Sequence, residues 1–210
     1  MYSVPALVGS RVWLEPLSSQ HVESLVAAAS EDRSTYRYTN VPDGLDAMAR
    51  YVDTLIADRE GGRAFPFVQR RSLDDTLVGC TRFMNPFRWF GRGSPADPYP
   101  DEVEIGGTWL AASAQRTGIN LEAKLLLLSY AFDHWEVQRV AVCTDARNDR
   151  SRRAIEGIGA ELDGILRRHR PSTIPGEEGN LRDSALYSIT FDHWPLVRDR
   201  LESSLAVHEI

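Results

Sequence analysis

The strongest constraint on the fold is an uninterrupted apolar run, Val140-Ala141-Val142-Cys143, inside a segment that extends from Arg139 to Thr144. Successive side chains of a strand point to opposite faces of its sheet, so a run without polar positions predicts a strand buried on both faces. We therefore expect this segment to lie inside a sheet.

Further strand and helix patterns surround this run. Apolar residues at strand spacing predict strands at 11–17, 64–70, 76–84, 103–110, 161–168 and 185–191. Apolar residues at helical spacing predict helices at about 20–29, 45–59, 120–135, 149–157 and 195–206. This order predicts a mixed α/β sheet within a single domain that spans residues 1–210.

Composition excludes several classes of protein. The 210 residues carry a net charge of -6, which gives no general electrostatic reason to bind nucleic acid. No window contains the roughly 18 apolar residues that a membrane span requires. The first nine residues lack the pattern of a signal peptide, so we expect a cytoplasmic protein.

The sequence also predicts that no metal is bound. Cys80 and Cys143 each lie within a strand pattern and are expected to be small buried hydrophobes, without a disulfide or a cysteine-based zinc site. None of the five histidines forms a His-x-x-x-His spacing.

The stretch from residue 85 to residue 101 is predicted to be a long loop. Its four prolines and two glycines are incompatible with a long helix or a central strand. It also contains Phe87, Trp89, Phe90 and Tyr99. Because long loops in compact domains are usually functional or disordered, we favour a lid on the substrate side over a plain linker.

The most informative segment is 115–120, Gln-Arg-Thr-Gly-Ile-Asn, between a predicted strand and a long predicted helix. Gly118 allows a tight turn and a close approach of the backbone to a ligand. The first turn of a helix leaves several N–H groups unpaired at the positive end of the helix dipole. Such a place suits a phosphate or pyrophosphate, to which Arg116 would add charge, although a purely structural turn has the same local pattern.

From Glu104 to Gly159 the chain resembles the GNAT superfamily of N-acetyltransferases, in particular the RimJ/RimL type that modifies ribosomal proteins. The matching segments include Glu104-Ile105-Gly106 and Trp109-Leu110 on a strand and Gln115-x-x-Gly118-x-Asn120 at a helix start. Asn148-x-x-Ser151 at a later helix start and Ile158-Gly159-Ala160 before a strand also match. The resemblance implies the fold and a cofactor, acetyl-CoA or another acyl-CoA.

The resemblance assigns cofactor contacts to two segments. It implies that backbone N–H groups of Gln115, Arg116, Thr117, Gly118, Ile119 and Asn120 hold the coenzyme A pyrophosphate. It also implies that the pantetheine arm pairs with the exposed backbone of Trp109, Leu110 and Ala111, where two strands splay apart. Asn120 stands where the family usually has Gly or Ala; Asn tolerates unusual backbone angles and can also cap a helix.

The expected reaction is direct attack of an amine on the thioester. A lysine amine with a pKa near 10.4 costs about 4 kcal/mol to deprotonate at pH 7, whereas an α-amine costs only about 1 kcal/mol. A modest general base therefore suffices for a protein N-terminus or a similar small amine. Glu104 is the candidate base and Glu102 the alternative; either can instead be a solvent-exposed carboxylate at a strand end.

The resemblance also implies a proton donor for the departing thiolate. The tyrosine that is common in the family after Asn148 is absent, which leaves Ser151 as the candidate general acid and Asn148 as a contact to cofactor or water. Both residues also suit an ordinary helix cap. Arg152 and Arg153 follow and are either solvated or near the 3′-phosphate of the cofactor.

Two other functions remain open from the sequence. A succinyl-CoA-dependent enzyme would call for an arginine near the acyl group, and Arg82, Arg88 and Arg92 are available. A domain that binds coenzyme A without turnover is the other alternative, which the retained Glu104, Asn148 and Ser151 oppose. A homodimer is a further expectation from the family.

Overall fold

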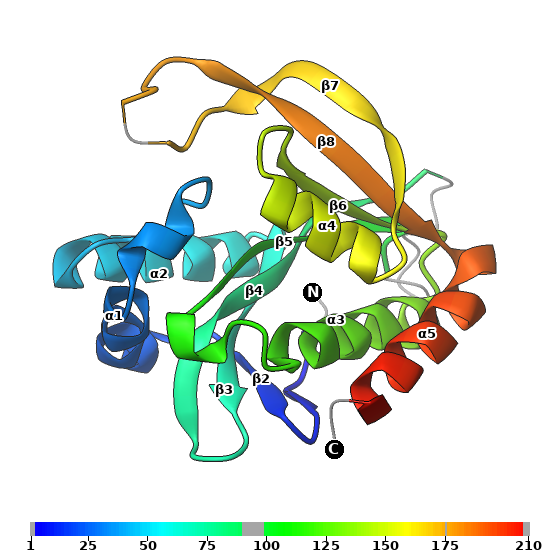
Figure 1. The fold of residues 1–210 in the computed structure, drawn as a ribbon, viewed down its shortest axis with the longest axis horizontal. Coiled ribbons are helices and arrows are strands. Elements are labelled where there is room, and N and C mark those ends of the chain that lie inside the picture. The colour runs from blue at the N-terminus through cyan, green and yellow to red at the C-terminus, as the bar shows by residue number, and fades with distance from the viewer. Residues whose placement is uncertain (1–2, 90–98, 175, 208–210) are drawn as a thin grey trace.

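A computed structural model describes residues 3–89, 99–174 and 176–207, and these form one mixed sheet with helices around it (Figure 1). The eight strands follow the order β1-β2-β3-β4-β5-β6-β8-β7, and only β5 and β6 pair in parallel. The strands are β1 (Leu7–Val8), β2 (Val12–Pro16), β3 (Ala64–Arg71), β4 (Thr76–Phe87), β5 (Glu102–Leu110), β6 (Arg139–Asp145), β7 (Glu161–Pro171) and β8 (Leu181–Thr190). The predicted mixed α/β sheet is confirmed.

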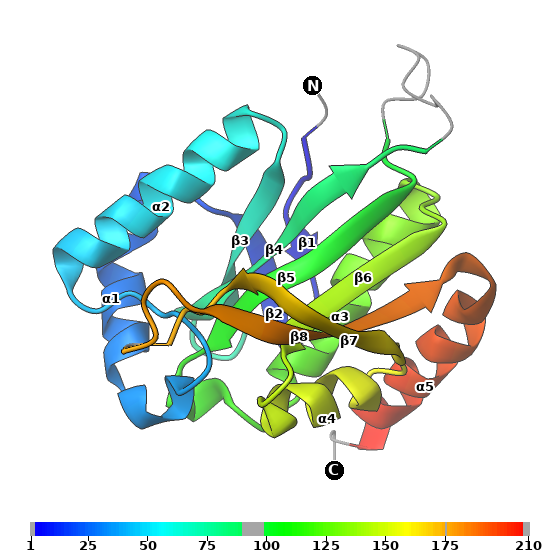
Figure 2. The same ribbon diagram turned by 90° about the horizontal axis from the view of Figure 1, so that it is seen from above.

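The helices gather in two groups. They are α1 (Val22–Ser30), α2 (Leu45–Glu60), α3 (Ile119–Ser129), α4 (Asp149–Gly157) and α5 (Trp194–Val207). In Figure 2, α1 and α2 lie together on one side of the molecule, and α3, α4 and α5 lie on the other. In the part of the chain that the structure describes, no helix is long and apolar enough to cross a membrane.

The interior of the sheet is covered on both faces. Six consecutive residues of β3, from Ala64 to Gln69, are buried, as are Val140, Ala141 and Val142 of β6. The strand predicted from the apolar run is thus confirmed. Cys80 is buried as expected, but Cys143 is partly exposed, because β6 leaves the side of β5 before that residue is reached.

Some element boundaries differ from those expected. Strand β4 continues through Asn85, Pro86 and Phe87. The prediction that the loop begins at residue 85 is therefore wrong. The register between β4 and β5 shifts here, and a bulge accommodates a proline that cannot donate a ladder hydrogen bond. Residues 90–98 lie outside the described part of the chain, so the lid remains a prediction.

The long helix expected at 120–135 has two parts. The α-helix α3 ends at Ser129, and a π-helical turn (Tyr130–His134) completes the segment, with the Trp135 N–H donating to the Tyr130 carbonyl at 3.2 Å. The two-residue strand β1 and the short 3-10 turn Arg33–Tyr36 have no counterpart in the sequence patterns. Both are too short to show a period.

The only lysine of the chain, Lys124, is buried against the sheet. Its Nζ atom lies 2.7 Å from the Thr108 hydroxyl and 3.4 Å from the Thr81 hydroxyl. Burial without a carboxylate partner lowers the pKa of Lys124 to about 7, because the charged form is poorly solvated there. The two hydroxyls supply the hydrogen bonds that a buried amine requires.

Candidate functional site

The central feature of the candidate site is a gap between β5 and β6. The two strands pair only over Glu102–Glu104 and Arg139–Ala141. Beyond Glu104, β5 pairs only with β4, and beyond Ala141, β6 pairs only with β8, so the strands diverge (Figure 1). A wedge-shaped opening with exposed strand edges results, and Glu104 lies where it closes.

The backbone of Leu110 faces this opening. The N–H of Ala111 donates to the Val78 carbonyl at 2.7 Å on the β4 side, and backbone groups of neighbouring strand residues point to alternate sides. The Leu110 N–H and carbonyl therefore point away from β4. The carbonyl, however, already accepts hydrogen bonds from the Tyr36 hydroxyl (3.1 Å) and the Gln115 amide (3.0 Å).

The turn before α3 has the geometry of an anion site. Gly118 is the N-cap of α3 with φ +83°, and Arg116 also has a positive φ of 63°. The Gln115 N–H donates to the Ala112 carbonyl, whereas no described backbone acceptor outside the helix is found for the N–H groups from Arg116 to Asn120. Free N–H groups at the start of a helix suit a pyrophosphate, so this turn fits the phosphates of coenzyme A.

Asn120 does not have the role that the sequence suggested for it. It is the second residue of α3 rather than the cap, and the unusual backbone angles fall on Arg116 and Gly118. Its Oδ1 atom is buried without a hydrogen-bond partner. The substitution of Asn for the family's small residue is thus compatible with the turn because the backbone at this position is ordinary helix.

Gln115 joins three segments that are far apart in the sequence. Its amide donates to the Thr35 hydroxyl at 3.1 Å, and its carbonyl accepts from Arg150 at 3.3 Å. Arg150 in turn donates to the Thr35 carbonyl at 2.5 Å. Neither Thr35 nor Arg150 belongs to a recognisable motif, so the sequence alone does not reveal their role. The side chain of Gln115 and its backbone N–H are therefore both engaged within the protein, so the free N–H groups of the turn begin at Arg116.

A basic hollow of about 310 Å³ adjoins this junction. It lies between the turn at 34–38 and the start of α4, and it is lined by Ser34, Thr35, Arg37, Tyr38, Arg147, Asn148, Asp149 and Arg150. Arg37 and Arg147 both stack near the Tyr38 ring, at 5.2 Å and 5.7 Å from its centroid. Of the residues predicted from the sequence, only Asn148 lines this hollow.

Glu104 is buried and fully engaged. Its Oε1 and Oε2 atoms accept from Arg170 at 3.0 Å and 2.8 Å, and Oε2 also accepts from the Asn85 amide at 2.9 Å. The hydrogen bond to Glu104 raises the pKa of the Arg170 guanidinium. The expectation of a solvent-exposed carboxylate is thus wrong for Glu104. Arg170, on the β7–β8 hairpin that arches over the opening, is a third residue that the sequence did not reveal.

Glu102 lies at the closed end of the wedge. Its carboxylate pairs with Arg139 at 2.8 Å, and Arg139 also pairs with Asp163 at 2.6 Å. These ion pairs link β5, β6 and β7 at the level where β5 and β6 are still paired. The position favours Glu104 over Glu102 as the carboxylate nearest to the opening.

The start of α4 is built as a helix cap. Asn148 is buried, and its Oδ1 atom accepts from the Ser151 N–H at 3.1 Å, so the capping interpretation holds for its oxygen. The Ser151 hydroxyl has no hydrogen bond within the described part of the chain. Arg152 is bound to the Tyr187 hydroxyl at 3.0 Å, while Arg153 is exposed.

We predict that Gly118→Ala weakens coenzyme A binding about tenfold. A side chain at φ +83° is strained by about 1–2 kcal/mol, and relief of that strain would move the free N–H groups. Calorimetric titration with coenzyme A measures the change. Gly157→Ala is the matched control, because Gly157 ends α4 with open space around it. An unchanged Kd for Gly118→Ala would contradict the phosphate assignment.

Comparison with known proteins places these features in a family. The family model for the acetyltransferase (GNAT) domain matches residues 11–161. A protein of Bacillus subtilis (strain 168), named as the putative ribosomal N-acetyltransferase YdaF, is 38% identical over 133 residues. The match covers 63% of this chain and 60% of that relative.

Solved structures agree with this match. A GCN5-related N-acetyltransferase from Brucella melitensis has 25% identity and a TM-score of 0.77, with 94% of this chain and 84% of that chain covered. RimJ of Mycobacterium smegmatis, in complex with CoA-disulfide, has 22% identity and a TM-score of 0.74 over 96% and 93% of the two chains, which indicates the same fold. The matched domain and the diverging central strands both lead to one conclusion: the chain belongs to the GNAT acetyltransferase family.

Proposed function

We propose that the protein transfers an acetyl group from acetyl-CoA to a primary amine, and that the α-amine of a protein is the preferred acceptor. The observation that carries this proposal is the row of free N–H groups from Arg116 to Asn120 beside the opening between β5 and β6. The family match supports acetyl-CoA as the donor.

Each group of the site has a role in the proposed reaction. The N–H groups of the turn before α3 hold the phosphates, and the Leu110 N–H orients the pantetheine arm along β5. The amine nitrogen bonds to the acyl carbon while the carbon–sulfur bond breaks. Glu104 accepts the amine proton, directly or through a water, and the Ser151 hydroxyl donates a proton to the departing sulfur.

The ion pair between Glu104 and Arg170 affects how the amine acceptor gains access to the Glu104 carboxylate. An acceptor that arrives as an ammonium ion can take the place of the Arg170 guanidinium, since both present a positive charge and N–H donors to the same carboxylate. Removal of its proton from an α-amine costs only about 1 kcal/mol at pH 7. The name of one relative, a putative ribosomal N-acetyltransferase, supports an amine of a ribosomal component as the acceptor.

A thiol-release assay tests the proposal. The protein is incubated with acetyl-CoA and a panel that contains peptides with free α-amines, the same peptides with blocked α-amines and a free lysine, and small primary amines. We expect thiol release and a mass increase of one acetyl group with the free α-amine peptides. Release only with succinyl-CoA would contradict the proposed donor, and coenzyme A binding without any turnover would indicate a non-catalytic domain.

A further inference from the structure

Arg82 lies at a bulge in β5, close to the candidate base. On β4 it pairs in register with Gly106, and the ladder between the strands shifts just beside it. A Cβ atom at Gly107 would come within 2.6 Å of the Arg82 Cζ atom, whereas one at Gly106 would lie 3.5 Å from the Glu104 Oε1 atom. The guanidinium and the carboxylate therefore flank two consecutive glycines at the edge of the opening.

Two further hydrogen-bond donors accompany Arg82. The hydroxyl of Tyr51, on α2, interacts with Arg82 and lies close to Trp109, and burial raises the pKa of that hydroxyl. The Trp109 side chain is buried, and its Nε1 atom makes no hydrogen bond of its own. A guanidinium, a neutral hydroxyl and an unpartnered indole N–H thus gather beside β5.

No carboxylate of the described residues balances the charge of Arg82. Three other partly buried arginines, Arg70, Arg139 and Arg170, each pair with a glutamate at 2.8 Å. A partly buried charge without a counter-ion is costly unless a ligand supplies one. The guanidinium fork presents paired N–H donors that match the geometry of a carboxylate.

We propose that Arg82, Tyr51 and Trp109 form a site for a carboxylate group of the substrate. This inference rests on the proposed function, in which the opening beside Glu104 holds the reacting amine and the acyl group. The carboxylate belongs either to the amine acceptor or to the far end of a dicarboxylic acyl group. Arg82 pairs with the carboxylate, and the Tyr51 hydroxyl and the indole N–H supply neutral hydrogen bonds.

The test compares Arg82→Gln with the wild type on matched substrates. The acceptor arm uses free amino acids against their amides, and peptides with Asp against Asn at the second position, all with acetyl-CoA. The donor arm uses succinyl-CoA against acetyl-CoA with one neutral peptide. In one of the two arms, we expect Arg82→Gln to raise the KM of the carboxylate-bearing substrate about tenfold to a hundredfold. The KM of the matched neutral substrate should change less than about twofold.

Controls separate recognition from folding. Arg70→Gln removes a partly buried arginine that pairs with Glu15 on the neighbouring strands, and it should leave the discrimination unchanged. Tyr51→Phe is a second test that can be used if Arg82→Gln does not fold. It removes one oxygen atom and should raise the KM of the same carboxylate-bearing substrates about threefold. Equal losses for charged and neutral substrates, or no preference of the wild type in either arm, would overturn the carboxylate site.

A binding measurement distinguishes this inference from the proposed function. If no amine is acetylated, calorimetry with succinyl-CoA, acetyl-CoA and the amino acid panel still reports the site. If the wild type binds a carboxylate-bearing compound more tightly than its neutral counterpart, and Arg82→Gln abolishes that difference, the inference holds even without turnover. Turnover of neutral amines without carboxylate selectivity would sustain the proposed function and refute the inference.

Discussion

Glu104→Gln should lower kcat for transfer from acetyl-CoA to a peptide α-amine by about 10²–10⁴-fold. The amide is nearly the same size as the carboxylate, and its oxygen still accepts one hydrogen bond from Arg170 or Asn85. It cannot accept a proton at neutral pH, so the attacking amine loses its base. The Kd of coenzyme A should remain within about threefold, because the phosphate turn is untouched. Steady-state thiol release and calorimetry measure the two quantities.

Glu102→Gln is the matched control for this prediction. Glu102 lies two residues before Glu104 on β5 and also pairs with an arginine, Arg139. Its variant loses a comparable ion pair at the closed end of the wedge, and we expect less than a tenfold change in kcat. Equal activity of Glu104→Gln and the wild type at pH 7 would remove Glu104 from the mechanism. A larger loss in Glu102→Gln would make that residue the base.

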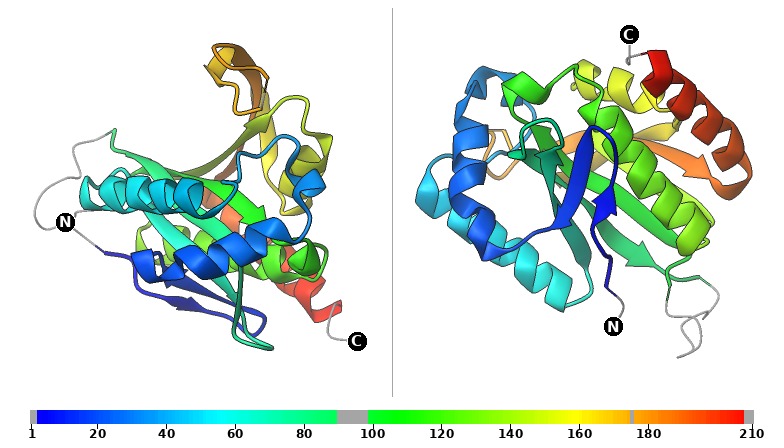
Figure 3. Two further views of the ribbon diagram at one scale, coloured as in Figure 1. Left: turned by 90° about the vertical axis from the view of Figure 1, so that its left-hand side faces the viewer. Right: turned by 90° about the horizontal axis from the view of Figure 1, so that it is seen from below.

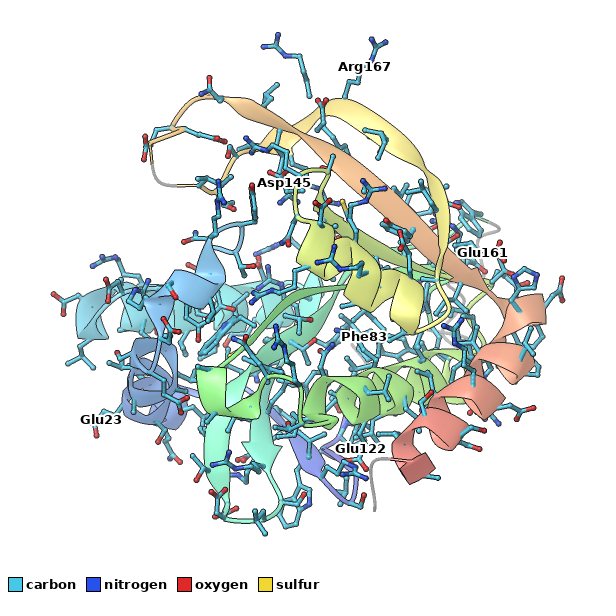
Figure 4. All side chains as sticks on the ribbon, in the orientation of Figure 1. Glu23, Phe83, Glu122, Asp145, Glu161 and Arg167 are labelled. Carbon is cyan, nitrogen blue, oxygen red and sulfur yellow. The ribbon has the colours of Figure 1, made fainter. Side chains whose placement is uncertain are left out.

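Glu122→Ala should lower the free energy of unfolding by about 3–5 kcal/mol. The carboxylate of Glu122, in the first turn of α3, accepts hydrogen bonds from the N–H groups of Ser10, Arg11 and Val12 and from the Ser10 hydroxyl, at 2.7–3.0 Å. It lies where α3 meets the hairpin of β1 and β2 (Figures 3 and 4). Each buried donor left without a partner costs about 1–3 kcal/mol, which partial hydration at the protein surface reduces.

Glu23→Ala is the control for this stability measurement. Glu23 is also a glutamate in the first turn of a helix, α1, but its side chain is exposed and points away from the protein (Figure 4). Loss of its interaction with the helix dipole should cost no more than about 1 kcal/mol. Chemical denaturation of the three proteins gives the comparison. A Glu122→Ala variant as stable as Glu23→Ala would show that the N-terminal hairpin is not held by this carboxylate.

Local patterns were sufficient for most of the fold. The apolar run at 140–143 identified a doubly covered strand. Helical spacing identified the α-helices of the described residues to within a few residues, except that α3 ends at Ser129 and not near residue 135. The turn at 115–120 was recognised because glycine between a strand and a helix has a specific backbone consequence, and Gly118 indeed has a positive φ. These features depend on residues that are close in the sequence, where periodicity and backbone preference act directly.

Boundaries set by neighbouring strands were less predictable. Pro86 suggested the end of a strand, yet β4 continues past it because a bulge against β5 removes the need for its missing N–H. Asn120 suggested a cap, yet the cap is Gly118. In both cases the residue type allowed two outcomes, and the partner strand or the turn geometry selected one.

The sequence by itself determined the order of the α-helices and of the described strands other than the two-residue β1, together with the glycine turn and the family of this chain. Only the tertiary structure decided which polar groups meet: Glu104 with Arg170, 66 residues away, and Thr35 with Gln115 and Arg150. It also showed that Arg82 lies beside the two consecutive glycines of β5 with no carboxylate partner among the described residues. The physical reason is that a buried charge is satisfied by whichever partner the packing brings near, and no short-range pattern in the chain records that partner.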